Sequence, residues 1–268
     1  MAVIHRNDEI ADGIYLLEAE LEDEDQGVPV PGQFYMVRGW GAYPLLSRPI
    51  SVFDYQEVPC VGLDGETEGA PVTRILSFLY QVVGEGTAIF TELAEGSGLE
   101  LEGPFGNGFP EVDHDLTLVG GGIGIAPLYY LARSYRHNHR ERRLSVYLGF
   151  AEEAYAVALF EEVADKVSVD VGGFITDQID PDNYTEKDTV ITCGPAPMMK
   201  AVMKKMPAQT SVYASLEARM ACGVGACLGC VKEAEMRYKN GPAGLEADGT
   251  IHVKVCKEGP VFKREVVS

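Results

Sequence analysis

Four cysteines near the end of the chain constrain its fold more than any other feature of the sequence. Cys222, Cys227 and Cys230 follow a C-x4-C-x2-C spacing, and Cys256 stands alone further along the chain. This is the ligand arrangement of plant-type [2Fe–2S] clusters. Glycines between the first three cysteines permit left-handed backbone conformations, which allow a loop to wrap around a cluster and aim N–H groups at its sulfurs. The spacing therefore predicts a [2Fe–2S] cluster held by these four residues.

Structural zinc is the main alternative for the four thiols. Zinc sites usually bring two short paired motifs, whereas here three cysteines share one loop and the fourth comes from a separate segment. In a reducing cytoplasm, cysteines grouped in this way indicate metal ligation rather than disulfides. The first nine residues reach acidic side chains before any long apolar stretch, which is not the pattern of a secretory signal, so we expect a cytoplasmic protein. Cys60 lies in an acidic stretch far from the group, and we interpret it as a bystander.

Composition excludes several classes of partner. The chain has 268 residues, of which 46% are hydrophobic and 24% charged, as in ordinary globular proteins of two or three domains. The net charge of −19 repels phosphate backbones and anionic membranes. The longest uncharged span, Leu116 to Ala132, is interrupted by glycines and is shorter than the roughly 20 residues that a membrane-spanning helix needs. We therefore expect neither nucleic acid nor a membrane as a partner.

Residues 1–110 contain short apolar or alternating runs separated by glycine and proline, a pattern typical of an antiparallel β-barrel. The expected strands are Gly13–Leu17, Gln33–Val37, Ile50–Phe53, Phe78–Val83 and Gly98–Leu101. The stretch 57–70 is acidic and contains glycine, and we interpret it as an exposed loop.

Residues 111–214 change to an alternation of strands and helices, which predicts a parallel sheet covered by helices. The expected strands are Leu116–Val119, Leu144–Leu148, Val167–Val171, Thr189–Thr192 and Ser211–Ala214, and the expected helices are Ala126–Arg136, Ala158–Asp165 and Pro197–Met206. Neither pattern continues in residues 215–268, which predicts a small third domain whose core is partly its metal centre.

A run of glycines follows the first strand of the α/β region. Gly121, Gly122 and Gly124 stand between an expected strand and an expected helix, where a glycine turn lets a pyrophosphate approach the helix N-terminus. The run lacks a full G-x-G-x-x-G fingerprint because Pro127 takes the place of the third glycine. Nucleotide binding and a plain tight turn are both interpretations of this segment.

The fourth strand of this region ends at Cys193 and Gly194, at the carboxyl edge of the sheet, where ligands bind in open α/β folds. Cys193 either contributes to that site or only packs as a small buried residue. Glu152 and Glu153 follow the second strand, where an acid bonds a ribose 2′-hydroxyl and repels a 2′-phosphate, which favours NAD over NADP. A solvated surface pair is the alternative for these two glutamates.

Three segments together resemble the ferredoxin–NADP reductase superfamily: Ser47–Ser51, the glycine run at 120–128, and Cys193–Pro195. The resemblance implies a multidomain α+β chain with an antiparallel FAD-binding β-barrel (1–110), a parallel-sheet α/β NAD-binding domain (111–214) and a small C-terminal [2Fe–2S] domain (215–268). It implies that FAD is contacted by Arg48, Pro49, Ile50 and Ser51. NAD would then be bound by Gly121, Gly122, Gly124, Cys193 and Gly194.

Within the superfamily, segments 220–230 and 255–262 resemble the electron-transfer subunits of dihydroorotate dehydrogenase B. That family implies further flavin contacts at Leu79, Tyr80, Gln81, Gly86 and Thr87. It also implies a flavin and iron–sulfur oxidoreductase that exchanges hydride with NAD in pyrimidine biosynthesis. The implied partner is a separate FMN-containing dihydroorotate dehydrogenase catalytic subunit, joined in a heterotetramer. No catalytic residue for dihydroorotate oxidation is then expected in this chain.

Three other functions fit parts of the same pattern. One is a standalone NAD(P)H-dependent reductase for a ferredoxin or an oxygenase, and another is an electron-transfer subunit of a hydrogenase or transhydrogenase complex. Both would use the same flavin, cluster and nicotinamide sites. The third is a zinc-stabilised nucleotide-binding regulator without redox activity, which would lack the flavin and iron.

Overall fold

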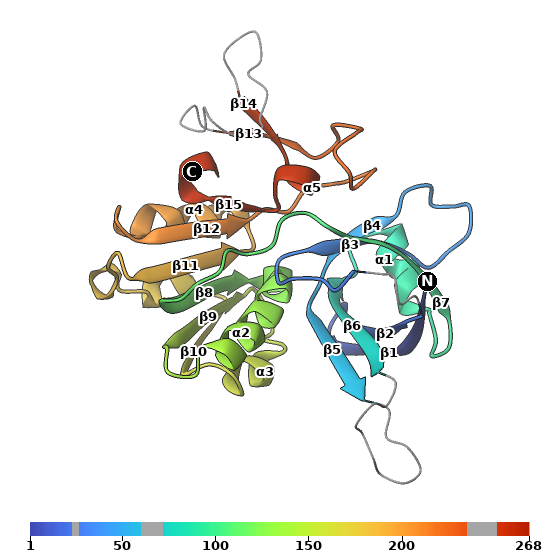
Figure 1. Cartoon of the computed structure of the whole chain (residues 1–268), viewed down its shortest axis with the longest axis horizontal. Coiled ribbons are helices and arrows are strands. Elements are labelled where there is room, and N and C mark those ends of the chain that lie inside the picture. Colours follow the sequence, from blue (N-terminus) through green and yellow to red (C-terminus); the bar gives the residue numbers. More distant parts are fainter. Residues whose placement is uncertain (23–26, 60–71, 235–250, 268) are drawn as a thin grey trace.

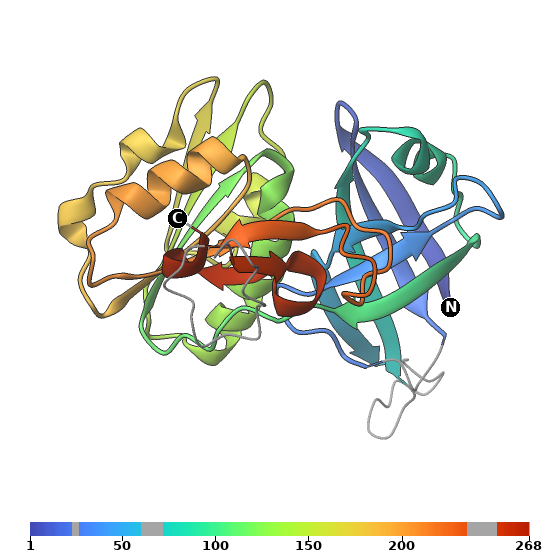
Figure 2. The same ribbon diagram turned by 90° about the horizontal axis from the view of Figure 1, so that it is seen from above.

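The computed structural model describes residues 1–22, 27–59, 72–234 and 251–267. These residues form a seven-stranded antiparallel sheet, a six-stranded and mostly parallel sheet, and a two-stranded hairpin. Figure 1 shows the first sheet curled into a barrel on one side of the molecule and the second sheet with its helices on the other. The segment that carries the cysteines lies over the junction of these two units (Figures 1 and 2).

The barrel sheet has the strand order β4-β3-β7-β1-β2-β6-β5. Its strands are β1 (Ala2–Ala11), β2 (Ile14–Leu21), β3 (Phe34–Arg38), β4 (Arg48–Ser51), β5 (Asp54–Pro59), β6 (Val72–Gln81) and β7 (Gly98–Phe105), and helix α1 (Glu85–Thr91) lies between β6 and β7. From Leu17 onward, alternate side chains of β2 are buried, as expected for a strand with one face toward a core. Pro49 lies in edge strand β4, where proline is tolerated.

The second sheet has the order β10-β9-β8-β11-β12-β15, and its first five strands are parallel. These strands are β8 (Asp115–Gly121), β9 (Leu144–Phe150), β10 (Lys166–Val171), β11 (Asp188–Cys193) and β12 (Ser211–Ser215). They alternate with η1 (Gly122–Ile125), α2 (Ala126–Asn138), α3 (Val157–Glu161), η2 (Ile175–Gln178), η3 (Pro181–Asn183) and α4 (Ala196–Lys205). This is a doubly wound order, whose switch point between β8 and β11 is where such folds bind ligands.

The C-terminal segment connects the cysteines to the α/β sheet. Its elements are β13 (Val231–Ala234), β14 (Ile251–Lys254), α5 (Val255–Glu258), β15 (Val261–Lys263) and α6 (Arg264–Val267). Strands β13 and β14 form the hairpin, and β15 pairs antiparallel with β12. The chain therefore returns to the α/β sheet directly after the fourth cysteine, a connection that the sequence pattern did not predict.

Helix α2 packs the barrel against the α/β domain. The rings of Phe53 and Tyr129 are stacked with their centroids 4.7 Å apart. Arg133 donates through Nε to a carboxylate oxygen of Asp54 at 2.8 Å and through a terminal nitrogen to the carbonyl oxygen of Tyr55 at 2.6 Å. Asp54 is 2% exposed, so this guanidinium compensates a buried charge. The interface holds the segment that follows β4 against the α/β domain.

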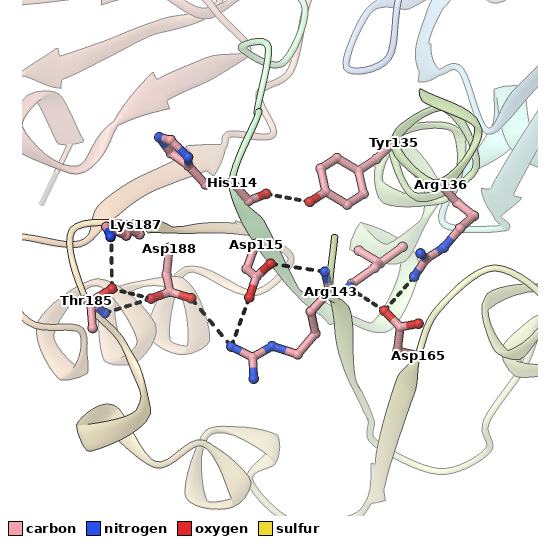
Figure 3. A network of polar contacts seen from close by, with 10 residues as sticks. His114, Asp115, Tyr135, Arg136, Arg143, Asp165, Thr185, Lys187 and Asp188 are labelled. Carbon is pink, nitrogen blue, oxygen red and sulfur yellow. Dashed lines mark hydrogen bonds and ion pairs between the residues drawn. The ribbon is translucent and has the colours of Figure 1, made fainter. Parts of the chain in front are cut away.

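A polar network joins the amino ends of the parallel strands (Figure 3). Burial alone would raise the pKa of Asp165, but a backbone N–H of β9 and the Arg136 guanidinium lower it below its ordinary value. Arg143 lies between Asp115 and Asp188, with N–O distances of 3.1 and 3.8 Å. The network stabilises the edge of the sheet opposite to the carboxyl ends of the strands.

The fold class expected from the sequence is confirmed, and each strand and helix expected in residues 1–214 is present with shifted ends. The described elements of this region that were not expected are β1, β5, α1 and the short helices η1, η2 and η3. The prediction of an exposed loop at 57–70 is wrong for its first three residues. Residues 57–59 belong to the edge strand β5, and their side chains are exposed. Residues 60–70, and with them Cys60, lie outside the described part. The described residues contain no helix that is long and apolar enough to span a membrane.

Candidate functional site

The four predicted cluster ligands lie in two pairs where the barrel and the α/β domain meet. The backbone N–H of Cys227 donates to Sγ of Cys222 at 3.4 Å, and that of Cys256 donates to Sγ of Cys230 at 3.4 Å. The first pair reaches the surface, whereas Cys230 and Cys256 are 3% and 2% exposed.

Two pairs of thiols fit a two-iron cluster, in which each iron takes two cysteines. Structural zinc sites usually bring two short paired motifs. Here Cys222, Cys227 and Cys230 share one loop, and Cys256 comes from a separate segment. The donor set therefore fits a [2Fe–2S] cluster better than zinc.

The cysteine loop has the backbone conformations that a cluster-binding loop needs. Gly223 and Gly225 have φ of 69° and 80°, and Leu228 has φ of 60°, a region that non-glycine residues rarely adopt outside functional turns. The N–H groups that this loop aims at sulfur lower the pKa of the Cys222 thiol to about 6, whereas burial raises that of Cys256 to about 12.

The same loop packs against barrel strands β3 and β7, and β3 pairs with β4, which carries the predicted FAD motif. A Cβ built on Gly223 would lie 2.8 Å from the Met36 side chain and 3.1 Å from Phe105, so only glycine fits this approach. Met36 of β3 pairs in register with Pro49 of β4. The two buried cysteines share a hydrophobic core with β3. The loop therefore stands beside the predicted flavin-binding residues.

Arg48 and Gly86 are far apart in the sequence but touch in the structure. A Cβ built on Gly86 would lie 2.6 Å from Cζ of Arg48, so the guanidinium rests directly on the glycine backbone. The same guanidinium lies over the Trp40 ring, with Cζ 5.3 Å from the centroid. Among the described residues, Arg48 pairs with no carboxylate and donates to the carbonyl oxygen of Leu46. A guanidinium fixed in this way fits the phosphate groups of FAD.

The other predicted FAD contacts differ in how far their side chains are exposed. Strand β4 leaves Arg48, Pro49, Ile50 and Ser51 half-buried at the edge of the barrel. The side chains of Leu79 and Tyr80 are 2% and 3% exposed and point into hydrophobic cores, so only their backbone is available to a ligand. Gln81 is exposed at the end of β6. The Thr87 hydroxyl caps the start of α1, where two backbone N–H groups donate to it and it donates to the carbonyl oxygen of Gly84.

The glycine run and the Cys193–Gly194 turn meet at the switch point of the α/β sheet. Gly120 of β8 pairs with Cys193 of β11. A Cβ built on Gly124 would lie 2.5 Å from both the α-carbon and the nitrogen of Gly194, so the two turns touch backbone to backbone. Gly122 has φ of 53° and open space around its missing Cβ. This edge presents backbone that a pyrophosphate can approach.

Two of the predicted NAD residues have roles in packing. Cys193 is 2% exposed in the core beneath α2, and burial raises the pKa of its thiol well above its ordinary value. A Cβ built on Gly121 would lie 2.6 Å from the sulfur of Met198, so this glycine allows α4 to approach β8. Glu152 and Glu153 are exposed just beyond β9.

Comparison with known proteins identifies the family. A model of the iron–sulfur cluster binding domain of dihydroorotate dehydrogenase B matches residues 217–268. The electron transfer subunit of dihydroorotate dehydrogenase B (NAD(+)) from Clostridium acetobutylicum is 36% identical over 97% of this chain and 93% of its own length. The chain belongs to the dihydroorotate dehydrogenase B electron-transfer subunit family. The same subunit from Caldanaerobacter subterraneus is 36% identical over 97% of this chain and 95% of its own length. The expected family is thereby confirmed.

Solved structures share the fold of this dihydroorotate dehydrogenase B family member. NADH-dependent reduced ferredoxin–NADP oxidoreductase aligns with a TM-score of 0.75 at 23% identity, over 99% of this chain and 89% of its own. Phthalate dioxygenase reductase aligns with a TM-score of 0.60 at 18% identity, over 95% of this chain and 93% of its own. At these identities the likeness concerns the fold alone, and it confirms the expected fold of an antiparallel barrel followed by an α/β domain.

Sequence reasoning missed one residue that packs beside the predicted flavin contacts Arg48 and Gly86. Trp40 is the single tryptophan of the chain, and both Arg38 and Arg48 lie over its ring. Its ring also packs on Phe90 of α1, with centroids 5.4 Å apart. A unique tryptophan between two arginines was the available signal, because arginine stacks on aromatic faces.

Proposed function

We propose that this chain binds FAD, a [2Fe–2S] cluster and NAD, and passes electrons between NAD and a dihydroorotate-oxidising subunit. The observation that carries the proposal is the packing of the four-cysteine loop against β3, beside the β4 residues Arg48 to Ser51. The contact brings a site for a one-electron carrier next to a site for a flavin. The glycine crevice between β8 and β11 lies on the neighbouring sheet.

When bound, a flavin takes up the two electrons of a hydride and releases them singly, and a [2Fe–2S] cluster carries one electron at a time. The chain itself binds and orients these groups. Arg48 provides a fork of donors for the FAD pyrophosphate, and Ser51 provides a hydroxyl for a ring heteroatom. Gly122 and Gly194 expose backbone to the NAD pyrophosphate, and Glu152 accepts a hydrogen bond from the ribose 2′-hydroxyl. The four cysteines hold the irons.

Exposed apolar side chains beside the cysteines support docking of a protein partner. Leu228 and Val224 belong to the cysteine loop and are 59% and 53% exposed. Clustered apolar side chains of this kind mark interaction surfaces. The curated relatives are named as subunits of dihydroorotate dehydrogenase B. We assign the partner as its FMN-containing catalytic subunit, joined in a cytoplasmic heterotetramer.

Leu228→Asp is expected to weaken association with that partner by roughly tenfold to a hundredfold, because it places a charge in a desolvated apolar contact. Sedimentation of mixtures of the two subunits measures the affinity. Val58→Asp is the control, because Val58 is 45% exposed on the far edge strand β5. Equal affinities for wild type and Leu228→Asp would place the partner on another surface.

Gly124→Ala is expected to raise the KM for NADH and to lower stability by about 1–3 kcal/mol, because the added methyl overlaps backbone that cannot turn aside. Urea unfolding and NADH oxidation with ferricyanide as acceptor measure the two effects. Gly41→Ala is the control, since a Cβ built on Gly41 has nothing within 4 Å. Unchanged stability and KM in Gly124→Ala would contradict the close contact of the two turns.

Co-expression with an FMN-containing dihydroorotate dehydrogenase subunit tests the function as a whole. The expected result is a stable complex that reduces NAD when dihydroorotate is added and forms orotate. The chain without its partner is expected to oxidise NADH with ferricyanide but not to oxidise dihydroorotate. A chain that forms no complex, yet reduces a soluble ferredoxin efficiently with NADH, would support the standalone reductase instead.

A further inference from the structure

Asn107 lies in the connection between the barrel and the α/β sheet and binds the backbone just after the fourth cysteine. Its Nδ2 donates to the carbonyl oxygens of Val261 at 2.9 Å and Glu258 at 3.2 Å, and its Oδ1 accepts from the N–H of Val261 at 3.0 Å. Its own N–H donates to the carbonyl oxygen of Gly259 at 2.6 Å. One residue thus makes four hydrogen bonds to a segment that is more than 150 positions away.

The residue before Asn107 brings the two backbones into contact. A Cβ built on Gly106 would lie 2.7 Å from Cδ of Pro260 and 2.8 Å from the carbonyl oxygen of Gly259, and Gly106 has φ of 78°. Gln33 of the barrel donates to the carbonyl oxygen of Gly106 at 2.9 Å. On the other side, the N–H of Leu216 donates to the carbonyl oxygen of Pro260 at 2.9 Å. The segment after the fourth cysteine is therefore held by both larger units.

Cys256 depends on this anchor because it lies in a helix of four residues, α5. So short a helix has no stability of its own, and its position is set by what precedes and follows it. Before it, β14 pairs with β13 in the described residues. After it come the residues that Asn107 binds. Cys256 also packs on β3 in a shared hydrophobic core, and Asn107 adds the hydrogen bonds that hold the backbone directly after it.

We propose that Asn107 is a positioning residue for the fourth cluster ligand, and that it fixes Cys256 relative to strands β3 and β4 of the barrel. The inference rests on the proposed function, in which a cluster at Cys256 exchanges single electrons with a flavin at β4. Electron transfer between two centres slows steeply as their separation grows or fluctuates. Loosening the anchor therefore slows this one-electron step and leaves hydride transfer between NAD and the flavin unchanged.

Two variants separate the contributions of the side chain. Asn107→Ala removes its three side-chain hydrogen bonds, and Asn107→Asp keeps the acceptor for Val261 but turns a carboxylate oxygen toward two carbonyl oxygens. Asn138→Ala is the matched control, because Asn138 is exposed at the end of α2. Backbone hydrogen exchange in peptides of residues 251–263 is expected to become about tenfold faster in both Asn107 variants. Exchange in the barrel and in β8–β11 is expected to match wild type.

Mixing each protein with NADH in a stopped-flow spectrometer supplies the second measurement. NADH gives a hydride to the flavin, and one electron then moves from the reduced flavin to the oxidised cluster. The first step is expected at the wild-type rate in both Asn107 variants. The second step is expected to be about tenfold slower, with iron content and the electron paramagnetic resonance spectrum of the reduced cluster retained.

Wild-type exchange in residues 251–263 together with a wild-type rate of the second step would overturn the proposal. A uniform loss of protection in all parts of the chain, with both steps slowed equally, would also overturn it, because Asn107 would then be a general stabilising residue. Absence of iron and acid-labile sulfide from the wild-type chain would overturn the proposed function and the ligand role together. In an iron-containing chain, failure of the Asn107 comparison overturns this inference alone.

Discussion

Cys256→Ser is expected to remove iron from the protein and to unfold the segment around β13, β14 and α5. Cys256 is 2% exposed and shares a core with Phe34 and Met36 of the barrel. A serine hydroxyl is a poor ligand for iron, so the cluster would keep three of its four thiolates. Because metal binding and folding are coupled in small metal domains, iron content is expected to fall by more than about tenfold. Metal analysis and limited proteolysis of the C-terminal segment measure the two effects.

The Cys256→Ser result has a matched control in Cys60→Ser. Cys60 lies outside the described residues, and the sequence predicts no role for it. Cys60→Ser is expected to keep its full content of iron and sulfide. FAD content is expected to stay near the wild-type level in both variants, because the predicted flavin residues lie in the barrel. A Cys256→Ser protein that retains its iron would show that Cys256 is not a ligand.

Arg48→Ala is expected to weaken FAD binding by roughly tenfold to a hundredfold, because charge-assisted hydrogen bonds to the pyrophosphate are lost. The guanidinium is held between the Trp40 ring and the backbone of Gly86, so its side chain is already ordered before a ligand arrives. Titration of the flavin-free protein with FAD, followed by quenching of flavin fluorescence, measures the dissociation constant.

Two variants serve as references for Arg48→Ala. Arg48→Lys keeps the charge but loses the planar fork, so it is expected to bind FAD with intermediate affinity. Arg140→Ala removes an exposed arginine beyond the end of α2 and is expected to bind FAD as the wild type does. Iron content is expected to be unchanged in all three. If Arg48→Ala bound FAD with wild-type affinity, Arg48 would not be a ligand of the pyrophosphate, which would then bind away from β4.

Strands whose apolar residues alternate or cluster could be predicted from the sequence, but β1 could not. Its middle carries charged and polar residues, which hide the alternation. These residues pair across the sheet instead, with His5 bonded to Glu20 at 2.8 Å and Arg6 to Glu18 at 2.9 Å. Cross-strand pairs of this kind stabilise a sheet only once both strands are in place. The sequence of one strand alone therefore gives no signal.

The C-terminal connection could not be predicted because its contacts are distant in the sequence. Strand β15 has three residues and becomes recognisable only through its pairing with β12. Asn107 likewise resembles an ordinary turn residue between two glycines until residues 258–261 are seen against it. Short elements of this kind have little intrinsic propensity, and tertiary contacts decide their structure.

The candidate ligands of the cluster could be predicted because three of them share one loop and their spacing is itself the signal. For the predicted flavin contacts, the sequence did not indicate which side chains are open to a ligand and which are buried. Arg48 stands at an open edge of the barrel, whereas the side chains of Leu79 and Tyr80 point into cores, and their direction depends on how β6 packs. A motif gives the position of a residue in the chain, but packing decides whether its side chain or its backbone meets a ligand.

Analysis of iron, acid-labile sulfide and FAD in the wild-type chain, purified without air, tests whether the four cysteines hold a cluster beside a flavin. We expect about two irons and two sulfides for each FAD, with cluster absorption beside the flavin bands. A protein that contained about one zinc and no sulfide would contradict this expectation, because the four thiols would then form a structural site without a path for electrons.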